Sequence, residues 1–166
     1  MKKRLLILLV CLTLLSILAV PTAAKTTRTE YEGEEYCYPM EGGQHWVSED
    51  GVYHVRGAQS HCTDVTDDQR MSGYALITVN ANFQFSDTGV YGPMWGTVLV
   101  SNEGGHWEGT WTGKVTELEG STYIRSVVFG HGDYEGLQAR AKLVRESPNP
   151  ADPYQIHGVI MDPGGH

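Results

Sequence analysis

A five-residue motif that carries a glutamate occurs twice in this sequence. Gly105–Gly109 (GHWEG) recurs as Gly132–Gly136 (GDYEG), at an offset of 27 residues. Two carboxylates held close together can act as a general acid and a general base, so Glu108 and Glu135 are candidates for that chemistry. The favoured interpretation is simpler. Both glutamates follow glycine turns, and Glu108 shares a strand face with threonine and lysine side chains, which predicts that it faces water.

Histidines and clustered aspartates are the candidate metal ligands. The seven histidines show no HxxxH or HExxH spacing, which favours scattered surface histidines, although strand residues can converge from distant positions. Asp64–Asp68 carries three carboxylates, a composition that suits calcium, but it lacks the glycine and the distal glutamate of an EF-hand loop. A plain polar loop is favoured there. The sequence therefore predicts no metal site and no cofactor, and it contains no nucleophile elbow or phosphate-binding loop.

Polar and aromatic residues on the predicted strands are candidates for binding a small molecule. Asn80 and Asn82 share the polar face of one strand and can orient a ligand by hydrogen bonds. Arg125 shares its face with aromatic and aliphatic residues, so it either binds an anionic group or faces outward. The tryptophans suit core or hairpin packing better than sugar binding. The predicted ligand-binding set is Tyr74, Asn80, Asn82, Trp95, Arg125 and Glu135.

The first 24 residues have the features of a signal peptide. Three cations precede the uncharged run Leu5–Val20, and small residues follow at Thr22–Ala24. We expect cleavage after Ala24 and a secreted or extracytoplasmic protein; an uncleaved anchor is the alternative. Without this segment, 9 Lys and Arg stand against 20 Asp and Glu, a net charge of −11. Such a charge disfavours nucleic acid and anionic membranes as partners.

Cys37 and Cys62 are the cysteines that remain after cleavage. In an exported chain, two cysteines predict one disulfide. Closure of the 26-residue loop would stabilise the fold by about 3–3.5 kcal/mol on the chain-entropy model. A metal or redox pair is disfavoured because there is no CxxC spacing.

The rest of the chain predicts strands. Apolar and polar residues alternate without a break over Tyr74–Phe85, which is typical of a half-buried strand. Residues 25–50 are acidic and glycine-rich, which predicts a solvated, partly disordered leader before a domain over 51–166. The other predicted strands cover residues 52–58, 95–101, 107–116, 122–129, 137–145 and 154–161, with a candidate short first strand at 44–48.

Seven or eight strands with short connections favour antiparallel neighbours. Such a sheet must cover its edges, and the simplest solution is an all-β, antiparallel up-and-down β-barrel of about eight strands, calycin-like. An open sandwich is the alternative. A barrel of this size either encloses one small ligand or is filled by side chains. Periodicity does not determine which face of each strand lines the lumen.

Several stretches between Trp95 and Ile160 carry a family likeness: WGTVLV, GGHWEGTWTGKV, the turn GHGDYEG at Gly130–Gly136, and the apolar strand that follows it. Together they resemble the allene oxide cyclase and dirigent β-barrel superfamily. The resemblance implies an eight-stranded barrel with a central cavity, often in homo-oligomers. It also implies that the barrel steers a reactive ligand through cyclisation or coupling.

Three functional hypotheses follow. The first is an exported barrel that binds a small apolar or amphipathic ligand in its lumen. The second is a cyclase or isomerase of the allene oxide cyclase and dirigent type, which would act by controlling substrate conformation, with polarity from Arg125, Asn80 or Glu135. The third is a filled barrel with a structural or interaction role.

Overall fold

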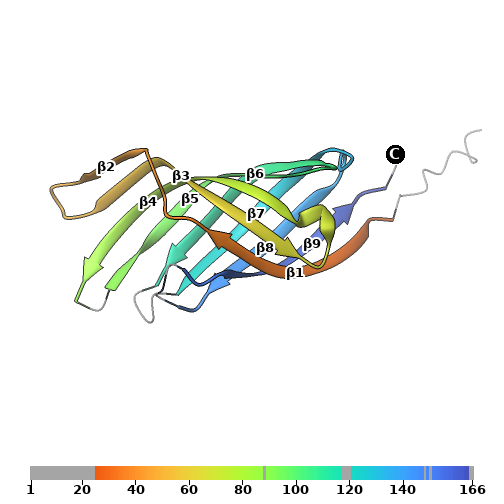
Figure 1. The fold of residues 1–166 in the computed structure, drawn as a ribbon. Helices are drawn as coiled ribbons and strands as arrows, with labels where there is room; N and C mark the ends of the chain where they lie inside the picture. The colour runs from red at the N-terminus through yellow and green to blue at the C-terminus, as the bar shows by residue number, and fades with distance from the viewer. Residues whose placement is uncertain (1–24, 88, 117–120, 148, 150, 165–166) are drawn as a thin grey trace, which may run out of the picture.

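The computed structural model describes residues 25–87, 89–116, 121–147, 149 and 151–164. The prediction of an all-β chain is confirmed (Figure 1). The predicted signal peptide lies outside the described residues, and no helix within them has the length and hydrophobicity to cross a membrane. The elements are β1 (Thr27–Cys37), β2 (Gln44–Val47), β3 (Tyr53–Thr66), the 3₁₀ turn η1 (Gln69–Met71), β4 (Gly73–Ser86), β5 (Gly89–Asn102), β6 (Gly105–Val115), β7 (Thr122–Gly132), β8 (Gln138–Arg145) and β9 (Tyr154–Asp162).

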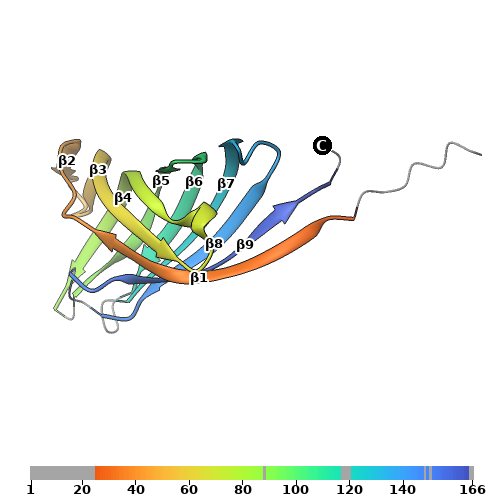
Figure 2. The same ribbon diagram turned by 45° about the vertical axis from the view of Figure 1, so that its right-hand side comes forward.

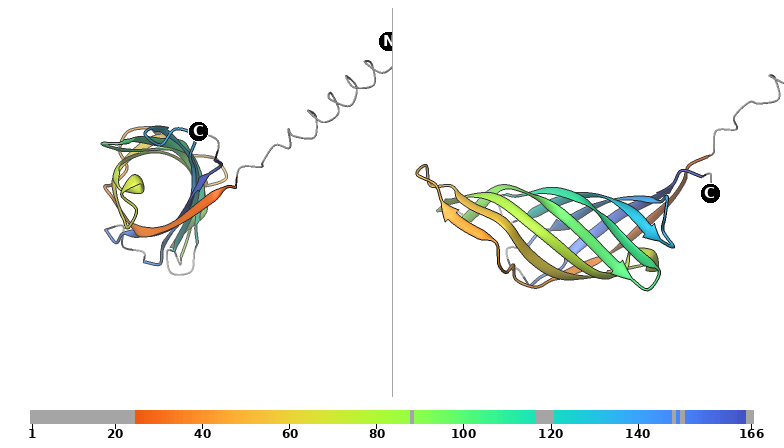
Figure 3. Two further views of the ribbon diagram at one scale, coloured as in Figure 1. Left: turned by 90° about the vertical axis from the view of Figure 1, so that its right-hand side faces the viewer. Right: turned by 90° about the horizontal axis from the view of Figure 1, so that it is seen from above.

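The strands form one antiparallel sheet that closes on itself. From β3 to β9 each strand pairs with the next one along the chain, and β1 pairs with both β9 and β3, which joins the two ends (Figure 2). Strand β2 pairs with β3 alone and lies outside the closure, so eight of the nine strands make up the closed sheet. The view along this sheet shows η1 inside it (Figure 3).

Strand β1 corrects the prediction of a disordered leader over residues 25–50. It pairs with β9 over Thr27–Glu35 and with β3 over Gly33–Cys37, and buries Tyr31 and Glu35 on its inner face. A strand that lies between two neighbours gains backbone hydrogen bonds on both edges, so it needs few apolar side chains of its own. The glutamates on its outer face gave this segment the composition of a solvated leader.

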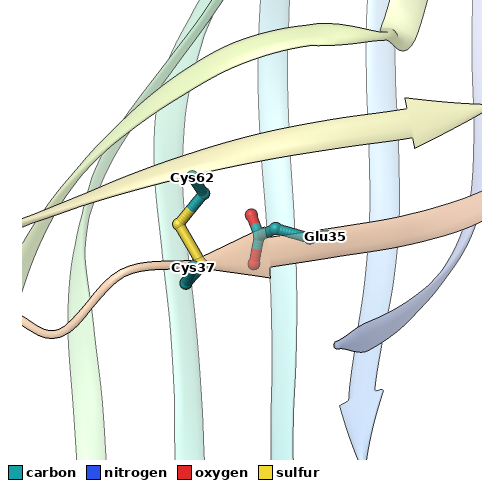
Figure 4. A group of neighbouring side chains, drawn as sticks. All are labelled: Glu35, Cys37 and Cys62. Carbon is teal, nitrogen blue, oxygen red and sulfur yellow. A yellow bond between two sulfur atoms is a disulfide. The ribbon is translucent and has the colours of Figure 1, made fainter. Parts of the chain in front are cut away.

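The predicted disulfide between Cys37 and Cys62 is present. The two cysteines are register partners at the end of β1, where this strand leaves the sheet (Figure 4). The bridge therefore fastens the strand that closes the sheet to β3.

On most strands the inner face of the closed sheet is the apolar face; β7 is an exception, because its outer face carries Tyr123, Val127 and Phe129. On β4, for example, Ala75, Val79 and Phe83 are buried and point inward. One end of the interior is closed around η1. There the buried indole of Trp107 donates a hydrogen bond from Nε1 to the carbonyl oxygen of Arg70 (2.8 Å) and stacks on Tyr134, with ring centroids 5.2 Å apart. This stacked pair and η1 form the closed end.

Glycines within and next to the repeated motif support the closed end. Gly132 has a φ of 74°, a left-handed conformation that favours glycine, as the turn prediction requires. A Cβ atom on Gly130 would lie 2.3 Å from the backbone oxygen of Tyr134, and one on Gly104 would lie 2.4 Å from the Tyr134 hydroxyl. These two glycines make room for the tyrosine, whose hydroxyl donates to Oδ1 of Asn102 (2.6 Å).

Candidate functional site

The closed sheet surrounds a cavity of about 840 Å³. Its walls are mainly apolar, and they include Val79, Phe83, Met94, Val98, Ile124 and Leu143. The volume lies within the range of about 300–1,000 Å³ that is usual for small-molecule sites. Side chains therefore do not fill the interior.

The cavity reaches the surface beside the connection between β1 and β2. Tyr38 and Met40 from this connection line the cavity and are 72% and 47% exposed, and Ala151 from the β8–β9 connection also lines it. This opening is the mouth of the cavity.

Two carboxylic acids face each other across the strands that close the sheet. Glu35 on β1 and Asp64 on β3 are register partners, and they are only 3% and 8% exposed. Figure 4 shows the Glu35 carboxylate next to the disulfide. Thr122, Arg145 and Tyr154 are among the other polar side chains that line the same cavity. These five residues form the inner polar cluster.

Backbone pairing brings the inner polar cluster together. Tyr154 on β9 is the register partner of Glu35, and Thr122 on β7 is the register partner of Arg145 on β8. The Arg145 guanidinium lies 4.6 Å from the centroid of the Tyr154 ring, a cation–π contact. The positive charge of Arg145 also acts on the carboxyl group of Glu35, which lies more than 100 residues away in sequence.

The surroundings of the two acids favour their protonated forms. Burial raises the pKa of Glu35 well above its usual value, and the nearby Asp64 raises it further, while the positive charge of Arg145 opposes both. Burial also raises the pKa of Asp64, to about 7. The pair therefore retains a proton close to neutral pH, so that one carboxyl can donate a hydrogen bond where the other accepts.

Two buried polar atoms in the cavity lining have no hydrogen-bond partner among the described residues. They are Oδ1 of Asp64 and Nε1 of Trp111. A buried polar group without a partner costs about 1–3 kcal/mol. A guest molecule that supplied partners for these atoms would recover part of that cost.

None of the six predicted ligand-binding residues lines the cavity. All six lie on the outer side, and their role in binding a ligand stays a prediction. The polar face of β4 points outward because desolvation favours the apolar face inside a closed sheet. This outer set comprises Tyr74, Asn80, Asn82, Trp95, Arg125 and Glu135.

Two of the outward residues hold the β2–β3 hairpin in place. Asn82 accepts a hydrogen bond at Oδ1 from Nη2 of Arg56 (2.7 Å), and Asn80 accepts one from the backbone N–H of Gly57 (3.1 Å). The Arg56 guanidinium contacts two tryptophan rings, at 5.4 Å from Trp46 and 4.9 Å from Trp95. These contacts are structural and lie outside the cavity.

The two glutamates of the repeated motif do converge, but on the outer surface. Oε1 of Glu108 lies 3.3 Å from Nε2 of His131, and Oε2 of Glu135 lies 3.7 Å from Nδ1 of the same ring. The prediction that Glu108 faces water is confirmed, since its side chain is 60% exposed. His106 stacks on His131 with centroids 4.8 Å apart. We refer to these four residues as the outer His–Glu cluster.

The Asp64–Asp68 segment is not the polar loop expected. Its first three residues belong to β3, with Asp64 facing inward. The carboxylate of Asp67 accepts from the backbone N–H of Glu32 (2.8 Å), and that of Asp68 accepts from the backbone N–H of Arg70 (3.1 Å). Asp67 and Asp68 thus serve separate structural roles, while Asp64 lines the cavity. The loop prediction failed because an inward aspartate breaks the alternation that marks a strand.

Neither Glu35 nor Asp64 belongs to the ligand-binding set predicted from the sequence, although the sequence holds a signal for them. Each lies two residues from a cysteine on the same strand face, Glu35 before Cys37 and Asp64 after Cys62. If the disulfide had been combined with antiparallel pairing, it would have placed the two carboxyl groups opposite each other. Glu35, Cys37 and Cys62 lie close enough together to suggest a metal site. The two cysteines are joined in the disulfide, however, so they offer no thiolate to a metal ion.

Comparison of the chain with protein-family models, curated proteins and solved structures found no match.

Proposed function

We propose that this chain is an exported, calycin-like up-and-down β-barrel that binds a small apolar or amphipathic molecule in its lumen. The observation that carries the proposal is the cavity of about 840 Å³, with apolar walls and one polar cluster. Export through the N-terminal signal fits the disulfide, because such bonds persist in oxidising compartments. Homo-oligomers, which the family resemblance implies, stay a prediction.

The inner polar cluster favours a ligand whose polar group is uncharged. Two carboxyl groups that retain a proton and one guanidinium give the cluster a charge close to zero, so an added anion or cation would lack a counter-charge. A hydroxyl group can accept from one cluster member and donate to another, and a carbonyl oxygen can accept. The ligand class is therefore an amphipathic molecule with a hydroxyl or carbonyl group.

A second candidate is a cyclase or isomerase of the allene oxide cyclase and dirigent type. It is favoured by one observation, the pair of buried acids, because a carboxyl group whose pKa is about 7 can give and take protons at neutral pH. The polar groups would be Glu35 and Asp64, in place of Arg125, Asn80 and Glu135. The apolar walls would fix the conformation of the substrate.

A binding titration with an uncharged fluorescent probe, N-phenyl-1-naphthylamine, tests the proposal. We expect saturable binding to the mature protein and its loss in Ala141→Trp, because Ala141 lines the cavity and the larger side chain would occupy it. The matched control is Lys142→Trp, since the neighbouring side chain is exposed on the outside of β8. Equal binding by the two variants, or none by the wild type, would overturn the proposal.

A second, smaller substitution keeps the proposal testable if Ala141→Trp does not fold. Ser126 also lines the cavity, so Ser126→Leu should weaken probe binding with a smaller change in volume. Both variants should retain the wild-type circular dichroism spectrum. Native mass spectrometry of the protein from its own host should then show a retained small molecule that is lost on unfolding, and this would identify what to test for turnover.

A further inference from the structure

The outer His–Glu cluster is a compact set of metal-ligating side chains outside the cavity. His106 and Glu108 are two residues apart on β6 and so point to the same side of the sheet, and His131 on β7 is the register partner of His106. One ligand atom from each of these three residues lies within 4.8 Å of the other two. Three ligands thus come from one pair of neighbouring strands.

The backbone around the cluster is well defined. The β6–β7 pairing is continuous from Gly105–Gly132 to Val115–Thr122, so the relative position of the three ligands does not depend on a loop. The imidazole rings of His106 and His131 stack nearly parallel, at an angle of 18°. Two imidazolium ions in this arrangement would repel each other, whereas a bound cation between the ring edges and Glu108 would hold neutral imidazoles together.

We propose that His106, Glu108 and His131 bind a first-row transition-metal ion, with zinc the best match to the donor set. Two imidazole nitrogens and one carboxylate oxygen are typical zinc ligands and leave a fourth position for water. Calcium and magnesium prefer oxygen ligands alone and fit this set poorly. With bonds of about 2.0–2.1 Å, tetrahedral ligand atoms lie about 3.3 Å apart, so small side-chain rotations would close the present separations.

Glu135 is suited to position His131 in this site. Its carboxylate faces Nδ1 while Glu108 faces Nε2, so the two acids lie at opposite nitrogens of the same ring. If the metal ion binds at Nε2, Nδ1 keeps its proton and donates to Glu135. A carboxylate that accepts from a metal-bound histidine fixes the tautomer and the ring orientation, and its loss typically costs about 10- to 100-fold in metal affinity.

Two other histidines pair with a carboxylate and provide a comparison. His61 pairs with Glu41, and His157 pairs with Glu32, each at 3.1 Å. Within the described residues, neither pair belongs to a group of three metal-ligating side chains, whereas the outer cluster does. A histidine–carboxylate pair alone therefore serves as a negative control.

Isothermal titration of the tag-free mature protein with zinc chloride tests the proposal. We expect one zinc ion per chain, and a loss of at least about 10-fold in affinity for both His106→Ala and His131→Ala. His157→Ala should bind zinc as the wild type does. Failure of the wild type to bind one equivalent, or equal losses in His131→Ala and His157→Ala, would overturn the proposal.

The role of Glu135 has its own readout. Glu135→Ala should weaken zinc binding by about 10-fold, and Glu135→Gln should recover part of it, because the amide oxygen can still accept from Nδ1. In the zinc complex, ¹⁵N spectra of the imidazole side chains should show His131 protonated at Nδ1. A tautomer protonated at Nε2 would contradict the assignment. Because the cluster lies outside the cavity, either result leaves the proposed lumen ligand untouched.

Discussion

Two groups of acids in this protein use the same residue types in opposite surroundings. Glu35 and Asp64 meet inside the closed sheet at 3% and 8% exposure, whereas Glu108 and Glu135 flank His131 outside it with side chains 60% and 74% exposed. Pairing between β1 and β3 assembles the inner pair, whereas the outer pair joins β6 to the turn between β7 and β8. The two pairs also differ in the medium around their carboxyl groups.

The surroundings change what each group can do. Inside, the loss of hydration favours protonation, so the inner pair is suited to hydrogen bonding and proton transfer with a neutral guest. Outside, the two carboxyl groups are exposed to water and lie next to the His131 ring, so the outer pair is suited to ion pairing and metal binding. The lesson is that carboxyl pairs cannot be assigned a chemistry until their burial is known.

The largest expected effect concerns the pH dependence of stability through Asp64. Its pKa rises from 3.8 to about 7 on folding, so between these values the folded state binds more protons than the unfolded state. The contribution of this group is therefore most favourable below about pH 4 and falls as the pH rises to about 7, by on the order of 4 kcal/mol. Asp64→Asn should make this decline smaller, and the part that comes from the raised pKa of Glu35 should remain.

Guanidinium unfolding at a series of pH values measures the effect. The matched control is Glu108→Gln, an exposed acid that should leave the wild-type decline unchanged. If Asp64→Asn keeps the same decline as the wild type, the distinction between inner and outer acids fails.

An intermediate effect is expected for the disulfide that supports the inner pair. Replacement of both Cys37 and Cys62 by alanine should lower the free energy of unfolding by about 3 kcal/mol, because the unfolded chain regains the freedom of a 26-residue loop. It should also loosen β1 and thereby expose Glu35. Chemical unfolding gives the stability, and zinc titration should show the outer cluster unaffected; a loss below about 1 kcal/mol would count against this role for the bridge.

The smallest effect is expected for the outer acids in the metal-free protein. The double change Glu108→Gln and Glu135→Gln should alter the free energy of unfolding by no more than about 1 kcal/mol, because exposed ion pairs contribute little. Thermal and chemical unfolding without added metal measure this change. A loss of several kcal/mol would mean that the outer cluster stabilises the fold, which would contradict the proposed difference between the inner and outer acids.

The sequence determined the local features of this protein. The alternation over Tyr74–Phe85 predicted the strand and its two faces, and Cys37 and Cys62 predicted the bridge. Each of these inferences depends on residue types at short spacing or on one covalent pairing. Such local patterns predict most of the strands. The disulfide, taken together with antiparallel pairing, also predicts that Glu35 and Asp64 lie opposite each other.

Only the tertiary structure decided which face of each strand is inside and which strand closes the sheet. Periodicity shows that two faces differ but does not orient them, and only the closed sheet places Asn80 and Arg125 outside the cavity. Strand β1 carries mostly glutamates and gains its order from β9 and β3, strands that lie far along the chain. Strands that lie far apart in the sequence bury Glu35 and Asp64. Because these strands replace water around the two carboxyl groups, they raise the pKa of both.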